Sequence, residues 1–207
     1  CEEVGANVQE VAKGIGLDNR IGRKFLNAGP GYGGSCFPKD TLALMKTARD
    51  YKAPIELIET TVRVNTARKQ KMAQKIVDAL DGNVAGKTIA VLGLTFKPNT
   101  DDMRDAPALD IVPTLQAEGA KVRAFDPEGM TEAKHMLKDV QFASGPYDCV
   151  QGADAVVFIT EWDQFRALDL DRLKDALKTP VVIDLRNIYR PHEMAAKGFR
   201  YVSVGRP

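Results

Sequence analysis

Six short runs of β-branched and aliphatic residues alternate with helical segments from residue 87 onward, and this alternation constrains the fold more than any other feature. The runs are Thr88–Gly93, Val122–Pro127, Val140–Phe142, Ala155–Ile159, Val181–Leu185 and Tyr201–Val204. Helices are expected between them over residues 106–118, 131–137 and 171–177. Strands that are apolar throughout are typical of a parallel sheet covered by helices on both faces. The alternation therefore predicts an α/β fold with a doubly wound, parallel-sheet Rossmann-like domain.

Ligands of a doubly wound sheet bind beyond the carboxyl ends of its strands. Polar and aromatic residues follow several of the predicted strands at these ends. They are Phe96-Lys97, Asp126, Thr160-Glu161-Trp162 and Arg186. We therefore expect the ligand site of this domain among these loops.

The chain before residue 85 has helical periodicity instead. One helix ends near Gly14 or Gly16, a second covers residues 39–51, and a third begins at Pro54 and stops at Gly82. The third helix is long, and it is interpreted either as a spine between domains or a dimer surface, or as an ordinary amphipathic helix. We predict an all-helical central region over residues 1–84 and the Rossmann-like domain over residues 85–207.

Composition limits the function classes. The 207 residues carry a formal charge of +1, which gives no electrostatic reason to expect nucleic acid or an anionic membrane as a partner. The basic residues Arg68, Lys69, Lys71 and Lys75 are interpreted as the solvated side of the third helix. No apolar run approaches the roughly 20 residues that span a bilayer, and no signal peptide is expected. Three cysteines do not form a disulfide framework, so a cytoplasmic protein is expected.

A glycine-rich run over Gly29–Asp40 contains a cysteine and is the strongest candidate for chemistry. Four glycines in six residues let the backbone approach a bulky group, and Cys36 then stands near the start of the second helix. A helix N-terminus and the nearby Lys39 would stabilise a thiolate, and Asp40 follows four residues after the cysteine. A buried structural cysteine is the alternative. On the residues alone, both interpretations stay open.

The same run contains Gly29-x-Gly31-x-x-Gly34, which matches the dinucleotide-binding pattern. That pattern requires a strand before it and a helix directly after it, and no strand precedes Gly29. Gly93 does follow a strand, but the second and third glycines are missing there. No segment of the chain is a standard NAD pyrophosphate loop.

The remaining cysteines and histidines give weak signals. Cys149 precedes an apolar strand and is expected in the core, while Cys1 carries no argument. His135 and His192 are far apart and have no clustered partners, so neither a metal site nor a Cys–His catalytic pair is expected.

Five segments together resemble the UDP-glucose 6-dehydrogenase family, over essentially the whole chain. They are Arg20-Ile21-Gly22, Phe25–Gly29, Gly31–Asp40, Gly93–Arg104 and Asp184–Asn187. Related enzymes act on GDP-mannose or UDP-N-acetylmannosamine. They tend to have leucine at the position of Phe37 and histidine at that of Ser35, respectively, so these two residues favour UDP-glucose.

The resemblance implies oxidation of UDP-glucose to UDP-glucuronate with two NAD⁺. Removal of hydride from the C6 alcohol gives an aldehyde, which a cysteine thiolate attacks to form a thiohemiacetal. Loss of a second hydride gives a thioester, and water releases the acid. By resemblance, Cys36 is the nucleophile and Asp40 is the carboxylate that supports the catalytic water.

Other roles are also carried over by resemblance. Arg20 matches an arginine that a neighbouring subunit lends to the diphosphate, and Arg104 matches one near the NAD pyrophosphate. The residues matched to UDP-sugar binding are Arg20, Phe25, Leu26, Asn27, Ala28, Tyr32, Gly33, Phe37, Phe96, Lys97 and Arg186. Guanidinium groups suit phosphate oxygens, and a surface ion pair is the alternative for each arginine.

Family members begin with an NAD-binding domain, and this domain with its catalytic lysine, asparagine and glutamate would precede Cys1. We therefore expect this chain to fold, to form a homodimer or higher homo-oligomer through its helical region, and to lack dehydrogenase activity alone. The alternatives are a stand-alone nucleotide-sugar-binding or dimerisation module, a dehydrogenase for another nucleotide sugar, and an unrelated thiol enzyme. The last would need a histidine base near Cys36.

Overall fold

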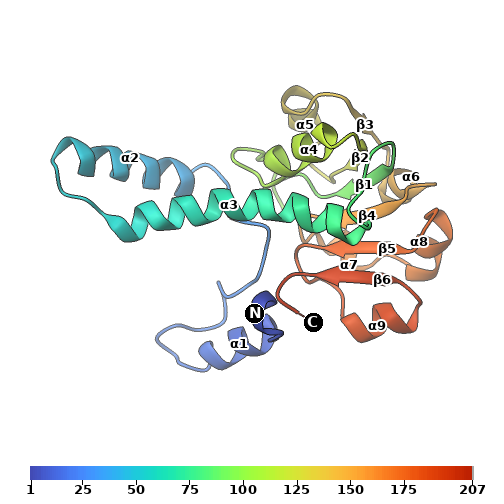
Figure 1. Cartoon of the computed structure of the whole chain (residues 1–207), viewed down its shortest axis with the longest axis horizontal. Helices are drawn as coiled ribbons and strands as arrows, with labels where there is room; N and C mark the ends of the chain where they lie inside the picture. Colours follow the sequence, from blue (N-terminus) through green and yellow to red (C-terminus); the bar gives the residue numbers. More distant parts are fainter. Residues whose placement is uncertain (207) are drawn as a thin grey trace.

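The structure is a computed structural model that describes residues 1–206. A six-stranded parallel sheet forms one end of the molecule, with the strand order β3-β2-β1-β4-β5-β6 (Figure 1). The strands are β1 Thr88–Leu92, β2 Lys121–Phe125, β3 Val140–Phe142, β4 Ala155–Phe158, β5 Val181–Asp184 and β6 Arg200–Ser203. This is a doubly wound order, with the switch between β1 and β4, so the predicted fold class is confirmed.

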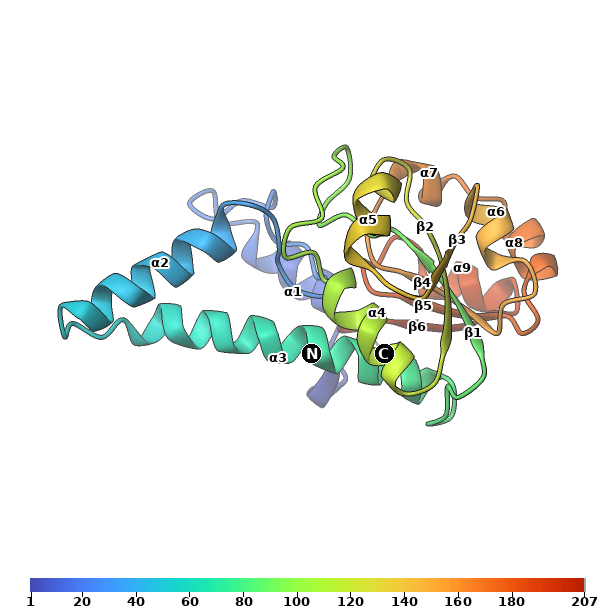
Figure 2. The same cartoon turned by 90° about the horizontal axis from the view of Figure 1, so that it is seen from above.

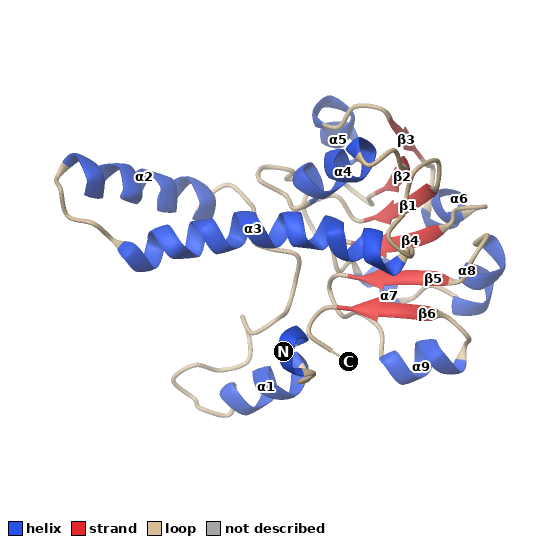
Figure 3. Ribbon diagram, in the orientation of Figure 1, coloured by secondary structure: helices blue, strands red, loops and turns tan. Residues whose placement is uncertain are grey.

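Helices cover both faces of the sheet, as Figures 2 and 3 show. Within β1, Ile89 and Val91 pack on one face while Ala90 and Leu92 pack on the other, because successive side chains of a strand alternate. The first face is covered by α3 Glu56–Ala79, α4 Ala108–Ala117 and α5 Met130–Met136. The second is covered by α6 Pro146–Val150, α7 Asp163–Arg166, α8 Leu170–Ala176 and α9 Pro191–Ala196. Both faces are therefore buried, which explains why the strands are apolar throughout.

The helices α2 Phe37–Asp50 and α3 form an arm that projects from the sheet (Figure 1). Before them come the 3₁₀ turn η1 Glu2–Val4 and the helix α1 Val8–Ile15. The inner half of α3 packs into the core through Met72, Ala73 and Ile76, whereas Leu57 in its outer half is 85% exposed. None of the described helices is both long and apolar enough to cross a membrane.

The interpretation of the basic stretch as a solvated helix face is wrong for most of its members. Lys69 is buried, where its ammonium pairs with Asp110 at 2.9 Å and donates to the Asp105 carbonyl at 3.0 Å. Arg68 donates from Nε to a loop carbonyl, and Lys75 forms an ion pair. This side of α3 faces the N-terminal turn at Glu2, the loop at Gly29 and the start of α4 with the loop before it, and the helical pattern alone does not reveal these partners.

Candidate functional site

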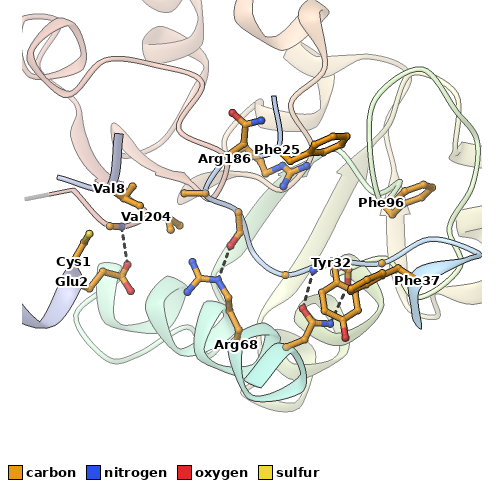
Figure 4. A pocket seen from close by; sticks show the side chains of 17 residues that line it. Cys1, Glu2, Val8, Phe25, Tyr32, Phe37, Arg68, Phe96, Arg186 and Val204 are labelled. Carbon is orange, nitrogen blue, oxygen red and sulfur yellow. Dashed lines mark hydrogen bonds between the residues drawn. The ribbon is translucent and has the colours of Figure 1, made fainter. Parts of the chain in front are cut away.

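A pocket of about 880 Å³ lies between α3, the loop before α2 and the carboxyl end of the sheet (Figure 4). This volume is within the range of small-molecule sites. Eight residues predicted to bind a UDP-sugar line it: Phe25, Asn27, Ala28, Tyr32, Gly33, Phe37, Phe96 and Arg186. The pocket therefore brings together residues from both halves of the sequence.

The loop that forms one wall of the pocket is fastened to α3. The Asn65 side chain accepts from the Tyr32 backbone N–H at 2.8 Å and donates to the Tyr32 carbonyl at 3.1 Å. The ring of Phe37 lies edge-on to that of Tyr32, with centroids 4.6 Å apart. Two aromatic side chains thus hold fixed positions on the pocket wall.

The glycines of this loop are needed because the sheet's own loops come close to it. Gly34 has φ +93°, and a Cβ there would lie 2.7 Å from the Phe96 ring. A Cβ on Gly33 would lie 2.3 Å from the Asp105 carbonyl oxygen. The Gly34 N–H also donates to the Arg104 carbonyl at 2.7 Å. The bulky group that these two glycines accommodate is therefore the loop after β1.

A buried carboxylate fixes that loop. Asp126 follows β2 and is fully buried. Its oxygens accept from the backbone N–H groups of Leu94 at 2.7 Å and Gly129 at 2.8 Å, and from the Trp162 indole N–H at 3.2 Å. A carboxylate without a cationic partner is stabilised in the interior by such donors. Asp126 thus ties together the loops that follow β1, β2 and β4.

Arg186 reaches the pocket from the end of β5. Its guanidinium forms an ion pair with Glu161, and its backbone N–H donates to the buried carboxylate of Asp184 at 3.0 Å. The Arg186 side chain is only 14% exposed. Both acidic partners fix the orientation of this arginine, so a cation stands in the wall at a defined place.

The cysteine of the glycine-rich run is exposed at the start of α2. Cys36 is the N-cap residue, its Sγ lies 3.6 Å from Ser35 Oγ, and its carbonyl accepts from the Asp40 N–H at 2.9 Å. The Asp40 carboxylate pairs with Lys39 and raises the pKa of that lysine. Cys36 does not itself line the pocket, but the next residue, Phe37, does.

Other predicted site residues lie outside the pocket. Arg20 is on the surface in an ion pair with Asp18 at 2.6 Å. Arg104 donates two hydrogen bonds to Asp102, at 2.9 and 3.0 Å, which lower the pKa of that carboxyl. The ammonium of Lys97 lies 5.2 Å from the centroid of the Phe96 ring. Leu26 and Asp40 also lie outside the lining set. Here the surface-pair alternative describes Arg20 and Arg104.

Sequence reasoning did not identify Asn65 and Arg68 as pocket residues, although both line it. They are three residues apart on α3, and Lys69 follows directly, so the three side chains point to one side of the helix. Polar groups at this spacing were the available signal. Among residues 1–206, no group of three or more histidine, cysteine, aspartate or glutamate side chains could hold a metal ion.

These features define a class of protein. A doubly wound sheet presents a pocket at its ligand-binding edge, with aromatic rings, two guanidinium groups and an exposed thiol next to the wall. Aromatic rings suit a base or sugar, and guanidinium groups suit phosphate. In an α/β protein, such a site suits an anionic ligand that contains rings.

Comparison with known proteins identifies the family within this class. Two models of the UDP-glucose/GDP-mannose dehydrogenase family match the chain, the central domain over residues 1–67 and the UDP-binding domain over residues 90–191. The chain belongs to this family. It is 62% identical over its whole length to a UDP-glucose 6-dehydrogenase of Rhizobium meliloti (strain 1021) and covers 47% of that protein. The chain therefore spans about half the length of the curated relatives it matches.

Solved structures agree on the fold. A UDP-glucose dehydrogenase from the hyperthermophilic archaeon Pyrobaculum islandicum has a TM-score of 0.85 at 32% identity, over 99% of this chain and 45% of that one. An NDP-N-acetyl-D-galactosaminuronic acid dehydrogenase from Methanosarcina mazei Go1 has a TM-score of 0.86 at 29% identity, over 100% and 45%. The shared architecture thus extends across enzymes named for different sugars.

Proposed function

We propose that this chain is the nucleotide-sugar-binding and nucleophile-bearing part of an NAD-dependent UDP-glucose 6-dehydrogenase, which oxidises UDP-glucose to UDP-glucuronate. The observation that carries this proposal is the placement of Cys36. The thiol is exposed at a helix N-terminus, and the following residue is part of the wall of a pocket of suitable size. The 62% identity to a UDP-glucose 6-dehydrogenase supports the choice of sugar.

In this proposal the pocket holds the UDP-sugar. The loop that holds this ligand consists of the backbone from Phe25 to Ala28, which includes Leu26 and Asn27, together with Tyr32, Gly33 and Phe37. Phe96 and Lys97 contact the sugar and its hydroxyls, and Arg186 donates to the ligand as a further contact. Arg20, exposed on one chain, is lent to the diphosphate of a neighbouring subunit.

Cys36 performs the covalent chemistry. Its thiolate attacks the C6 aldehyde, so a C–S bond forms and the carbonyl oxygen takes a proton to give a thiohemiacetal. Loss of hydride from C6 and of the hydroxyl proton leaves a thioester. Water ordered by Asp40 then adds to the thioester carbonyl, the C–S bond breaks, and the thiol and the carboxylic acid are released.

NAD⁺ accepts both hydrides in the chemistry of this family. The described residues do not fit a complete NAD site, because the glycines between residues 29 and 34 lie in a loop without a preceding strand, and Gly93 stands alone after β1. Arg104 is assigned to the NAD pyrophosphate, which requires it to exchange Asp102 for that ligand. We therefore assign to this chain the sugar nucleotide and the nucleophile, and not the hydride acceptor.

The arm is the proposed surface for a homodimer or higher homo-oligomer. Large apolar side chains are exposed along it, including Leu42, Leu44, Leu57 and Val64. Burying them in a second copy of the chain would remove apolar surface from water. We also place the protein in the cytoplasm, where reducing conditions suit its three free cysteines.

The full-length protein provides the decisive experiment. Cys36→Ser should abolish formation of UDP-glucuronate and leave UDP-glucose binding within about twofold, because the hydroxyl is a far weaker nucleophile than a thiolate. Cys1→Ser, at the exposed cysteine that itself lines the pocket, should retain full turnover. Wild-type turnover by Cys36→Ser would remove Cys36 from the mechanism.

Three further observations separate the alternatives. The isolated chain should not reduce NAD⁺, and measurable reduction would contradict the division of roles proposed here. A competition assay with UDP-glucose, GDP-mannose and UDP-N-acetylmannosamine identifies the sugar nucleotide. A dinucleotide fingerprint encoded upstream of Cys1 would favour the enzyme, and a start codon near Cys1 would favour a binding or dimerisation module.

A further inference from the structure

Arg68 is a cation in the pocket wall that none of the roles above uses. It lies in α3, half-buried, and donates from Nε to the Gly29 carbonyl at 2.7 Å. Across residues 1–206, its two terminal guanidinium nitrogens have no hydrogen-bond or ion-pair partner. A guanidinium has five N–H donors, so four of them remain available to a ligand.

Gly29 is close to both Arg68 and Arg186. A Cβ at Gly29 would come within 2.2 Å of Arg186 Nη1, so the second guanidinium packs directly against the same residue. One arginine comes from the arm and the other from the end of β5. The two cations thus approach a single glycine from different regions of the molecule.

The two arginines differ in how far the protein neutralises them. Arg186 has the carboxylate of Glu161 as its partner. The acidic group on the side of Arg68 is Glu2, which pairs with Lys75 at 2.9 Å and accepts from the Gly205 N–H at 3.2 Å. Burial alone would raise the pKa of Glu2, but Lys75, the Gly205 N–H and the charge of Arg68 together lower it.

The charge balance of the pocket therefore favours an anion. Glu2 and Lys75 cancel each other, as do Glu161 and Arg186, and Arg68 contributes one uncompensated positive charge. Phosphate oxygens are the acceptors that guanidinium groups bind best, through paired hydrogen bonds. A diphosphate offers two such groups a few ångströms apart, which suits two separate cations.

We infer that Arg68 is a ligand-binding residue and that it holds the diphosphate of the nucleotide sugar together with Arg186. The inference rests on the proposed function for the identity of the nucleotide. In this arrangement the Nε bond to Gly29 orients the guanidinium plane, and the terminal nitrogens donate to phosphate. Arg68 then acts on ligands with phosphate groups and leaves the contacts to the nucleoside unchanged.

Calorimetry of the 207-residue chain with UDP-glucose, UDP, uridine and inorganic pyrophosphate tests the inference. Arg68→Gln keeps a polar side chain and removes the charge. It should raise the Kd for UDP-glucose and UDP at least about tenfold, as expected for loss of charge-assisted hydrogen bonds, and change the Kd for uridine by less than about twofold. Arg68→Lys keeps the charge but loses the paired hydrogen bonds, so it should restore only part of the affinity.

Arg63→Gln is the matched control, since it is the same substitution on α3 at a residue that faces α2 and not the pocket. It should change every Kd by less than about twofold. Equal losses for uridine and UDP-glucose in Arg68→Gln would overturn the inference, because the residue would then act only through the shape of the loop. Unchanged affinity for UDP-glucose would overturn it as well.

The pyrophosphate measurement separates this inference from the proposed function. If the wild-type chain binds pyrophosphate but not UDP-glucose, and Arg68→Gln loses the pyrophosphate, the anion site stands and the proposed function fails. If UDP-glucose binds equally well to wild type and Arg68→Gln, the function stands and the anion site fails. A wild-type chain that binds none of the phosphate ligands overturns both.

Discussion

The sheet region and the arm differ in where they place their apolar side chains. Residues such as Phe158 and Ile111 in the sheet region have no exposed surface, whereas Tyr51 and Leu57 on the arm are more than 80% exposed. Among the described residues, every exposed large hydrophobic except Met136 lies before residue 65. The sheet region therefore buries its large apolar side chains within the single chain, whereas the arm leaves many of its own exposed to water.

The same contrast between buried and exposed apolar side chains occurs within the single helix α3. Met72 in its inner half is 2% exposed, and Leu57 in its outer half is 85% exposed. The pocket is located where the two environments meet, with Asn65 and Arg68 on α3 and Arg186 at the edge of the sheet. We conclude that the sheet region supplies stability, while the arm supplies surface and half of the site.

The largest effect on stability should come from the core of the sheet. Phe158 packs against the rings of Phe165 and Tyr189, with centroids 5.9 and 5.4 Å away. Phe158→Ala should lower the free energy of unfolding by about 3–5 kcal/mol, because it removes buried contacts and leaves a cavity. Urea denaturation measures the loss. Leu57→Ala on the arm is the matched change. An equal loss of unfolding free energy in that variant would contradict the contrast between the sheet region and the arm.

A smaller but still substantial effect is expected at the buried carboxylate that fixes the loops. Asp126→Asn keeps the shape but turns an N–H₂ group toward N–H donors, so we expect a loss of about 2–3 kcal/mol of unfolding free energy. Asp163→Asn, at a carboxylate that is 98% exposed, should leave the denaturation midpoint unchanged. A stable Asp126→Asn variant would show that the loops hold their positions without this carboxylate.

The sheet was predictable because its signals are local. Strands that are apolar on both sides and helices with a regular period can each be recognised within a few residues, and β1, β2 and β5 lie close to the predicted ranges. The helices α6, α7 and α9 were missed because they have only five, four and six residues, too few to establish a period. The burial of Lys69 was missed since its partner Asp110 is distant in sequence.

The site was predictable only as separate pieces. The glycine-rich run predicted much of one pocket wall, and the strand ends predicted Arg186 in another. The bonds that join these pieces link residues 33 and 39 positions apart, as for Asn65 with Tyr32 and Arg68 with Gly29. A single sequence does not encode such pairings as a period or motif, so the helical spacing of Asn65 and Arg68 indicates a shared face of α3 but not the loop residues that it contacts.

Alkaline pH should lower the free energy of unfolding of the sheet region by a moderate amount for each pH unit. Burial raises the pKa of the Cys149 thiol to about 12, and it also raises the pKa values of Tyr189 and Tyr201. A group whose pKa is higher in the folded state stabilises the fold below its unfolded pKa. That stability is lost as the pH rises, here from about pH 9 toward pH 12 for Cys149.

The loss due to Cys149 should approach about 1.4 kcal/mol per pH unit within that range. Denaturation at pH 8 to 10.5 measures the slope, which Cys149→Ala should flatten. Leu57→Ala, at a residue on the arm that does not titrate, should leave the slope as it is. A slope that stays the same in Cys149→Ala would show that the burial of this thiol is not its cause.

The smallest effect on stability is expected for a substitution on the arm. Such a substitution distinguishes an exposed apolar side chain from a buried one most directly. Leu57→Ser should change the free energy of unfolding of the monomer by less than about 0.5 kcal/mol, since the side chain is already in water. It should nevertheless weaken self-association at least about tenfold if a second copy covers the arm. Sedimentation velocity over a range of concentrations measures the association, and denaturation of dilute protein measures the monomer. Met136→Ser makes a similar change on the sheet region, at a residue that is 44% exposed, and should leave association unaltered. A large loss of monomer stability in Leu57→Ser would mean that the arm packs its apolar face within one chain, and the contrast between the two regions would then not hold.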